Sequence, residues 1–343
     1  MLTKSLWCLL FLLPIVVCPA ATAKTIYVDD HGPADFNTIQ EAIDDANDGD
    51  TVLVAPGTYA GEGNRDIDFK GKAITVKSED DPEICIIDCQ GFQKEPHRAF
   101  YFHSEEDANS IIQGFTITGG FIVRHEPGGG IFCENSSPQI IDCIIIGNEA
   151  RTGGGIATTN SAAQIIDCIV KNNIAADGGG IGIGTNDDGT VLIKGCIITG
   201  NHAVFHPRFG GEGGGIIVYS PSQISNCTIT GNIGGYSGGG ICFRNGTYVS
   251  NSIIWGNTFH FGYGSEIALM DIPTYWKNPS NVIIQNSLVG SGTEDDFGFL
   301  SDSEQCLEGE WLQGYPCFVA LGHLNHSGTQ ELRVFNLTMS ACK

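Results

Sequence analysis

The sequence is poor in basic residues. Lysine and arginine total 17 against 39 aspartates and glutamates, which gives a formal net charge of −22. Nucleic acids and anionic lipids are bound through positively charged surfaces, so this charge balance argues against both as partners. A polyanionic glycan would likewise need a bound cation or a local basic patch before it could approach this chain.

Long hydrophobic runs are also scarce. The apolar run Leu6–Cys18 follows Lys4 and precedes the small residues Ala21-Thr22-Ala23. This order is typical of a secretory signal peptide, which we assign to residues 1–23. No later stretch approaches the ~18 apolar residues that a membrane-spanning helix needs. We therefore expect no membrane insertion, and a mature chain that is extracellular, periplasmic or attached to the cell surface.

Over most of the chain the helical pattern is missing too, and a repeat takes its place. The motif Gly-Gly-Gly-Ile recurs with its isoleucine at steps of 25, 25, 35 and 25 residues, at Ile131, Ile156, Ile181, Ile216 and Ile241. In each unit a short apolar stretch ends on an asparagine: Asn148, Asn173, Asn201, Asn232 and Asn257. A fixed period of short apolar strands indicates a β-solenoid. The predicted fold is all-β, a single-stranded right-handed parallel β-helix over residues 61–290.

In such a fold equivalent residues stack ~4.8 Å apart and form ladders along the axis. The asparagines are expected to adopt the left-handed conformation of a tight corner and to bond to the same amide one coil away. The glycines are expected at a second corner, where Cβ atoms would collide. Four cysteines should form an inward ladder of buried thiols, with Ser252 in the next coil: Cys143, Cys168, Cys196 and Cys227.

The two ends of the chain depart from the repeat. Residues 24–60 should form an N-terminal cap and first coil, with strands at Thr25–Val28 and Thr51–Val54. Between these strands a helix should start at Thr38 and run to about Asp48, with an apolar face that covers the open end of the coil core. Residues 291–343 are expected to be a C-terminal cap or a tail, in which Cys306–Cys317 is the favoured disulfide.

The segments Thr25–Asp30, Asp35–Ile43 and Gly49–Tyr59 resemble the opening of pectin-lyase-like β-helix proteins, pectin methylesterases among them. The later repeats resemble those of bacterial surface proteins and of chlamydial polymorphic outer-membrane proteins. The resemblance covers residues 24–290 and implies the fold, which hosts lyases, hydrolases, esterases, epimerases and non-enzymes. Three motifs of its enzymes are absent: Asp-Phe-Ile-Phe-Gly of the methylesterases, Arg-x-Pro-x-x-Arg of pectate lyases and Asp-Pro-His-Asp of alginate epimerases. Whether this chain is an enzyme therefore stays open.

Function in a β-helix is expected where the period fails. The segments between each asparagine and the next glycine triplet vary most, and because they follow the same corner they should cluster along one edge as loops. Their candidate substrate-binding residues are Arg124, His125, Arg151, Asp177, Tyr236, Phe259, His260 and Tyr263. The longest insertion, residues 202–212, adds four catalytic candidates: His202, His206, Arg208 and Glu212. A histidine base and an arginine that neutralises a carboxylate suit β-elimination on a uronide, whereas the alternative is an ordinary solvated loop.

A metal site has a weaker basis. Asp142 and Asp167 occupy the same outward slot in neighbouring coils, ~5 Å apart, so a Ca²⁺ ion between them is conceivable. The slot continues as Gly195, Asn226 and Asn251 without a third carboxylate. Two solvated aspartates are the favoured interpretation, and no cofactor is predicted.

Two hypotheses for function remain. The first is a secreted binding or structural module directed at extracellular or cell-surface polysaccharide. The alternative is a polysaccharide lyase or glycoside hydrolase that uses a groove beside the corner segments. An enzyme requires His202, His206, Arg208 and a carboxylate to converge, whereas a binding protein would use aromatic side chains or a flat sheet face.

Overall fold

The computed structural model describes residues 22–123, 126–185, 189–204, 210–262, 264–270, 282–289, 297–300 and 335–339. The predicted signal peptide, apart from its last two residues, and the predicted Cys306–Cys317 disulfide lie outside these ranges. Within them, no helix is long and apolar enough to cross a membrane.

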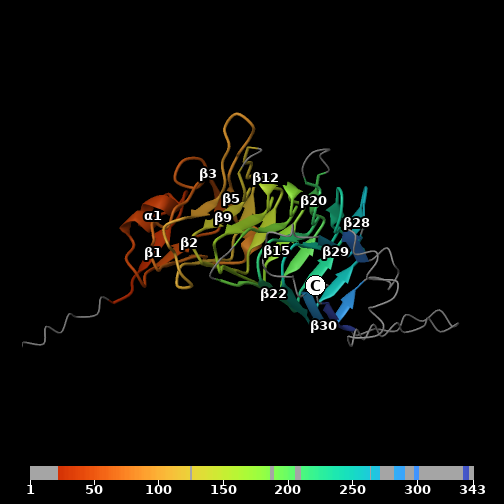
Figure 1. Cartoon of the computed structure of the whole chain (residues 1–343). Helices are drawn as coiled ribbons and strands as arrows, with labels where there is room; N and C mark the ends of the chain where they lie inside the picture. Colours follow the sequence, from red (N-terminus) through yellow and green to blue (C-terminus); the bar gives the residue numbers. More distant parts are fainter. Residues whose placement is uncertain are drawn as a thin grey trace, which may run out of the picture.

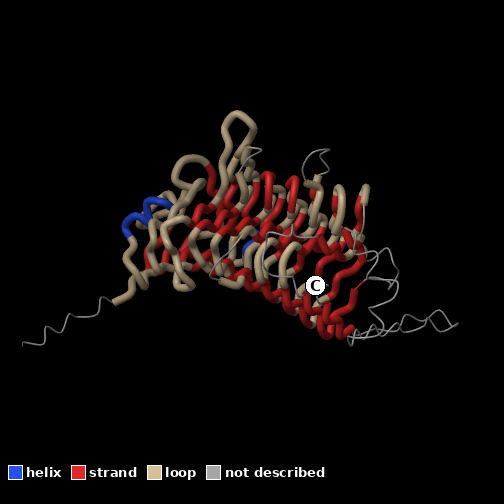
Figure 2. Tube along the Cα trace, viewed as in Figure 1, coloured by secondary structure: helices blue, strands red, loops and turns tan. Residues whose placement is uncertain are grey.

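The repeat winds into coils that stack side by side along one axis (Figure 1). A complete coil contains four short strands: β10 (Gln139–Ile141), β11 (Ile144–Ile146), β12 (Glu149–Thr152) and β13 (Ile156–Thr159). The next coil pairs with this one in parallel and in register, so Ile140 lies opposite Ile165 and Ile156 opposite Ile181. Figure 2 shows the resulting parallel strands separated by loops. The period of the sequence is therefore one coil.

The largest sheet has nineteen strands and contains two rows. The β10 row consists of β1 (Thr25–Val28), β2 (Thr51–Val54), β4 (Thr75–Ser78), β7 (Ile111–Gln113), β10, β14 (Gln164–Ile166), β18 (Val191–Lys194), β22 (Ser222–Ser225) and β26 (Thr247–Ser250). The β11 row consists of β3 (Gly57–Ala60), β5 (Cys85–Asp88), β8 (Thr116–Thr118), β11, β15 (Ile169–Lys171), β19 (Ile197–Thr199), β23 (Thr228–Thr230) and β27 (Ile253–Trp255). Both rows end on β30 (Val282–Val289), and β32 (Phe335–Met339) pairs with β30 in the antiparallel direction.

Two smaller sheets complete the coils. The eight-stranded sheet consists of β6 (Phe100–Phe102), β9 (Ile131–Glu134), β13, β17 (Ile181–Ile183), β21 (Ile216–Val218), β25 (Ile241–Phe243), β29 (Ile267–Met270) and β31 (Phe297–Leu300). The five-stranded sheet consists of β12, β16 (Ile174–Asp177), β20 (His202–Ala203), β24 (Ile233–Gly234) and β28 (Thr258–Phe259). Because β31 pairs in parallel with β29, parallel pairing extends beyond the expected boundary at residue 290.

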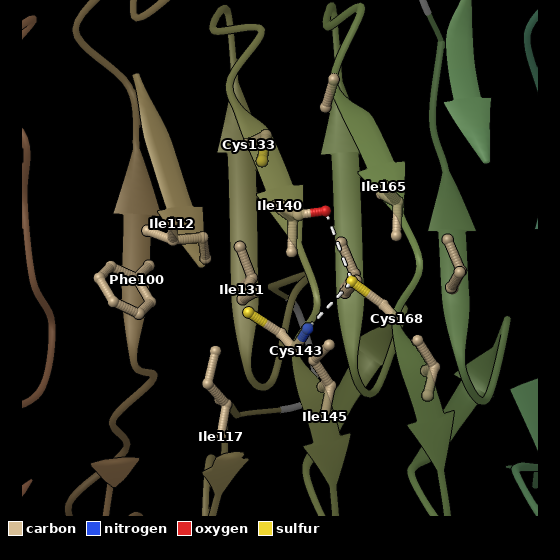
Figure 3. Packing of buried hydrophobic residues seen from close by; sticks show 14 of the residues in the cluster. Phe100, Ile112, Ile117, Ile131, Cys133, Ile140, Cys143, Ile145, Ile165 and Cys168 are labelled. Carbon is tan, nitrogen blue, oxygen red and sulfur yellow. Dashed lines mark hydrogen bonds between the residues drawn. The ribbon is translucent and has the colours of Figure 1, made fainter. Parts of the chain in front are cut away.

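The core lies inside the coil. Figure 3 shows inward side chains of successive strands meeting there, among them Ile131, Ile140 and Ile145 beside Cys143. The eight described cysteines between Cys85 and Cys242 are all buried and free, as predicted for the cysteine ladder. The ladder ends in hydroxyls, since Ser252 Oγ accepts from the Cys227 N–H (3.1 Å) and Ser287 Oγ from the Ser252 N–H (3.1 Å). Small polarisable thiols fill an apolar position without needing a full hydrogen bond.

The asparagine ladder forms as predicted, but the conformation assigned to it was wrong. Asn173 Nδ2 donates to Asn201 Oδ1 (3.0 Å), and Asn201 Nδ2 donates to Asn232 Oδ1 (2.9 Å). The left-handed residue is the one before each ladder asparagine, for example Gly147 (φ 68°) and Asn172 (φ 54°). Because that preceding residue makes the turn, the amide of the asparagine itself points into the protein, where its exposure is between 0 and 3%.

The ladder has two distinct ends. At the N-terminal end Asn148 Oδ1 accepts from the Gly120 N–H (2.8 Å). At the other end Asn257 Nδ2 donates to Glu266 Oε2 (2.5 Å), and Glu266 Oε1 also accepts from the Gly256 N–H (2.8 Å). A carboxylate thus takes the place of a sixth asparagine, and this buried polar column is satisfied at both ends.

The glycine triplets allow the close approach that was predicted. The first glycine of each triplet has a positive φ, as at Gly153 (61°). A Cβ on Gly154 would lie 2.6 Å from the Gly179 carbonyl oxygen one coil away, closer than any side chain tolerates. Only glycine fits where the chain turns back onto the next strand.

A short helix, α1 (Ile39–Asp45), lies at the N-terminal end of the stack (Figure 1). The Thr38 hydroxyl accepts from the Glu41 N–H (3.3 Å), which confirms the predicted start. The helix stops before the expected Asp48 because Ala46 takes an extended backbone (ψ 151°). Ile39, Ala42 and Ile43 belong to the core cluster. The role of this helix as a cap stays a prediction.

We predict that Asn201→Ala destabilises the protein by about 3 kcal/mol or more, because it leaves the Asn173 N–H and the Val170 carbonyl buried without their partner. Thermal or urea unfolding measures this effect. The control is Asn160→Gly, since Asn160 is exposed and left-handed (φ 48°), and its side-chain amide donates to another surface asparagine, Asn135. Equal effects of the two substitutions would contradict a structural role for the ladder.

Candidate functional site

The segments expected to be variable loops come together along one edge, but they do so as the strands of the five-stranded sheet. Glu149 pairs with Ile174, Ile174 with His202 and His202 with Ile233. In the first four strands the alternate positions are small and buried: Ala150, Ala175, Ala203 and Gly234. Backbone pairing between coils therefore orders these segments, and the labels β12, β20 and β28 in Figure 1 mark the edge that they form.

The five-stranded sheet separates the predicted site residues into two groups. Arg151, His202 and His260 lie on its solvent side, where the two imidazole rings meet edge to face at 5.5 Å. Burial, and then the neighbouring His260, lower the pKa of His202, and its Nε2 atom is buried without a hydrogen-bond partner. Tyr236 and Phe259 are half-buried. Arg124, His125, His206, Arg208 and Tyr263 lie outside the described residues.

The other group lies where the five-stranded sheet meets the eight-stranded sheet. Asp177 at the end of β16 forms a parallel bridge with Glu212, and the Glu212 N–H donates to Asp177 Oδ1 (3.3 Å). Arg244, next after β25, holds the buried Glu212 carboxylate in a fork, with Nη2 2.6 Å from Oε1 and Nε 2.9 Å from Oε2. The Arg244 guanidinium lies 5.5 Å from the ring centre of Tyr219. We call Asp177, Glu212, Tyr219 and Arg244 the Glu212 cluster.

Charge is distributed unevenly in the Glu212 cluster. Burial, and then the negative charge of Glu212, raise the pKa of Asp177 to about 6. Burial opposes the charge of Arg244, but its bonds to Glu212 outweigh that effect and raise the pKa of the guanidinium. Asp177 therefore changes its protonation near pH 6 beside a carboxylate that is already paired with a cation.

A second group of similar composition lies toward the N-terminal end of the eight-stranded sheet. The buried Arg98 guanidinium lies 4.9 Å from the ring centre of Tyr101 and 5.2 Å from that of Phe132, and the two rings stack at 5.4 Å. Arg98 Nη2 donates to Glu126 (3.2 Å), whereas Nη1 is buried without a partner. The Tyr101 hydroxyl donates to Glu134. Burial, and then this bond, raise the pKa of Tyr101 to about 12.

Each group contributes to one column of outward residues, which we call the outer row, Glu134 from the second group and Tyr219 and Arg244 from the first. It contains the third residue after each triplet isoleucine: Glu134, Thr159, Gly184, Tyr219 and Arg244. Glu134 pairs with Thr159 in register, and the Tyr219 N–H donates to the Ile183 carbonyl (2.8 Å). The row thus carries charged and aromatic side chains at its ends and small residues at its middle.

The residues of these groups that were not predicted from the sequence are Arg98, Tyr101, Phe132, Glu134, Tyr219 and Arg244. The signal for Glu134, Tyr219 and Arg244 was available, because counting three residues past each triplet isoleucine aligns them. Arg98 and Tyr101 precede the first triplet, so the repeat does not flag them.

The aspartate slot has a conformational explanation. Asp142 (φ 50°), Asp167 (φ 52°) and Gly195 (φ 69°) all take the left-handed conformation that aspartate, asparagine and glycine tolerate best. Burial, and then Asp167, raise the pKa of Asp142. Across the described ranges, no group of three or more His, Cys, Asp or Glu side chains lies close enough to hold a metal ion.

A family model described as a right handed beta helix region matches residues 62–222. The chain is a right-handed parallel β-helix. No curated protein shows significant sequence similarity to it.

Solved structures similar to this β-helix include a pectate lyase (14% identity, TM-score 0.48, 82% of this chain and 80% of that chain covered). Others are a pectin methylesterase from carrot (15%, 0.43, 82% and 89%) and a rhamnogalacturonan lyase (16%, 0.40, 73% and 73%). Identities this low carry no information about the activity of the β-helix.

The pKa of Asp177 predicts a pH-dependent stability. An unfolded aspartate loses its proton near pH 3.9 and the folded Asp177 near pH 6, so ionisation costs the native state stability as the pH rises between these values. We expect Asp177→Asn to match the wild type near pH 3.5 and to be about 1–2 kcal/mol more stable at pH 8, allowing for solvent screening of a half-buried group.

Urea unfolding at the two pH values measures this difference. Asp50→Asn is the control of opposite sign, because backbone N–H groups of Lys24 and Asn47 lower the pKa of Asp50. Relative to the wild type, Asp50→Asn should therefore be less stable at pH 8 than at pH 3.5. An Asp177→Asn variant that is no more stable than the wild type at pH 8 would contradict the assignment.

Proposed function

We propose that the chain is a secreted protein that binds polysaccharide along the outer row. Secretion rests on the signal-peptide pattern of residues 1–23. The ligand class rests on the side chains of the row, where the carboxylate of Glu134 at one end and the ring of Tyr219 and the guanidinium of Arg244 at the other flank small residues. Rings pack against the apolar faces of sugars, and charged groups accept from or donate to their hydroxyls.

The arrangement of Tyr219, Arg244 and Glu212 carries this proposal. Glu212 fixes the guanidinium of Arg244 through two bonds, and the half-buried Tyr219 ring lies beside it. A site whose side chains are already fixed loses little conformational entropy when a ligand binds. Arg98 and its two stacked rings provide a comparable platform at the other end.

The separation of the two platforms favours a chain of sugars. Glu134 and Tyr219 lie three coils apart, which corresponds to ~14 Å along the axis. Thr159 and Gly184 between them leave the row free of large side chains. A ligand that touches both ends must therefore be an oligosaccharide or a polysaccharide.

An enzyme is the second candidate, and the position of the histidines disfavours it. His202 lies on the solvent side of the five-stranded sheet, whereas Asp177 and Glu212 lie at the junction with the other sheet. The carboxylate pair favours an enzyme, because an acid whose pKa is raised to about 6, as in Asp177, beside a second carboxylate is the pattern of glycoside hydrolysis. This candidate predicts release of reducing ends that Asp177→Asn abolishes.

We predict that Tyr219→Ala weakens binding to a soluble polysaccharide by about tenfold, because it removes the ring against which a sugar packs. Affinity electrophoresis or calorimetry against a panel of neutral, amino-sugar and uronide polysaccharides measures this. Tyr219→Phe keeps the ring and should retain binding.

The matched control is Tyr27→Ala. Tyr27 is 51% exposed on β1, in the first coil and in the nineteen-stranded sheet, away from Tyr219. If no polysaccharide of the panel binds, or if the two alanine variants lose affinity equally, the outer row is not the binding surface.

A further inference from the structure

A second surface lies on the outward face of the β11 row. Six consecutive strands contribute to it, β8, β11, β15, β19, β23 and β27, and all pair in parallel and in register. Its first column is Thr116, Ile144, Ile169, Ile197, Thr228 and Ile253. Its second column is Thr118, Ile146, Lys171, Thr199, Thr230 and Trp255. We call these twelve residues the threonine–isoleucine face.

The threonine–isoleucine face is open to solvent at its C-terminal coils. Ile197 and Ile253 are each 43% exposed and Trp255 is 36% exposed. The residues between the two columns, such as Ile198 and Ile254, are fully buried in the core. Strand alternation therefore points the threonine, isoleucine and tryptophan side chains outward.

Charge is nearly missing from this face. Its twelve positions contain Lys171 and no acidic residue, although the chain has 39 acidic residues and a net charge of −22. An apolar and hydroxyl-bearing area of this kind on an acidic protein is suited to an uncharged partner.

The face is also periodic. In-register pairing repeats each column at ~4.8 Å along the axis, and the two columns lie ~6.6 Å apart along the strands. A rigid lattice of methyl and hydroxyl groups is complementary to a partner that is itself rigid and repetitive. Sugar rings in an ordered solid present the same alternation of apolar ring faces and hydroxyl edges.

We propose that the threonine–isoleucine face binds the ordered surface of an uncharged, insoluble polysaccharide. The indole ring of Trp255 and the branched aliphatic side chains of the isoleucines pack on sugar faces. The threonine hydroxyls exchange hydrogen bonds with sugar hydroxyls. A second copy of this chain fits less well. Two chains of charge −22 repel each other, and a dry contact would bury threonine hydroxyls without partners.

The proposal does not depend on the outer row, which belongs to a different sheet. The test is co-sedimentation of the protein with microcrystalline cellulose and with crystalline chitin. We expect wild-type protein to partition onto at least one solid, and Ile197→Glu to lower the partition constant about tenfold or more. Trp255→Ala should lower it as well. Tyr219→Ala should leave it unchanged, which separates this face from the outer row.

The matched control is Phe92→Glu, because Phe92 is 49% exposed in a turn outside the β11 row. Thr228→Glu serves as a second charged variant of the face, and thermal unfolding checks that every variant folds. The proposal is overturned if wild-type protein stays in solution with both solids, or if Phe92→Glu and Ile197→Glu reduce sedimentation equally. A dimer in light scattering that Ile197→Glu dissociates would assign the face to a second copy and would also overturn it.

Discussion

Parallel hydrogen bonding between successive coils is the constraint from which the rest of this structure follows. The Ile156 N–H donates to the Gly180 carbonyl (3.1 Å), and the Ile181 N–H donates to the Gly215 carbonyl (2.9 Å), so each residue lies against its own equivalent. A side chain in such a column must tolerate copies of itself at ~4.8 Å. Isoleucine, asparagine and cysteine do so, and they fill the interior columns. Aspartate does so poorly, and its column contains only Asp142 and Asp167 before glycine and asparagine replace it.

The same constraint explains how much the sequence revealed about the fold. When a sequence period equals one turn of the chain, residues that align in the sequence also align in space. The isoleucine, asparagine and cysteine ladders could therefore be predicted in detail. The left-handed corner was assigned one residue too late, although the glycines at 147, 200, 231 and 256 already marked the true position. The asparagine side chains are buried because their amides bond to one another, and the residue before each of them makes the corner.

The site was harder to predict, because its residues are the ones that do not repeat. Glu212 and Arg244 are 32 residues apart and meet only because the chain returns to register after the long insertion. Asp177 and Glu212 were among the candidates and lie side by side in the structure, but the edge that holds them was expected to be a set of loops. That edge is a sheet and has two sides, because the segments pair as β12, β16, β20, β24 and β28. The histidines therefore lie on the solvent side, whereas the carboxylates of similar segments lie at the junction with the eight-stranded sheet. Periodicity alone cannot tell which side of a sheet a non-repeating residue faces.

The asparagine ladder is a directed chain of hydrogen bonds. Every amide donates toward the C-terminal end and accepts from the N-terminal side, so the amide dipoles add along the axis like peptide dipoles in a helix. Their positive end lies at Asn257, and Glu266 places a carboxylate against it. The carboxylate accepts a hydrogen bond from Asn257 but has no N–H group to donate to a further asparagine, so the series ends there. Glu266 therefore sets the length of the ladder, and an extra coil could join the column only on the N-terminal side of that residue.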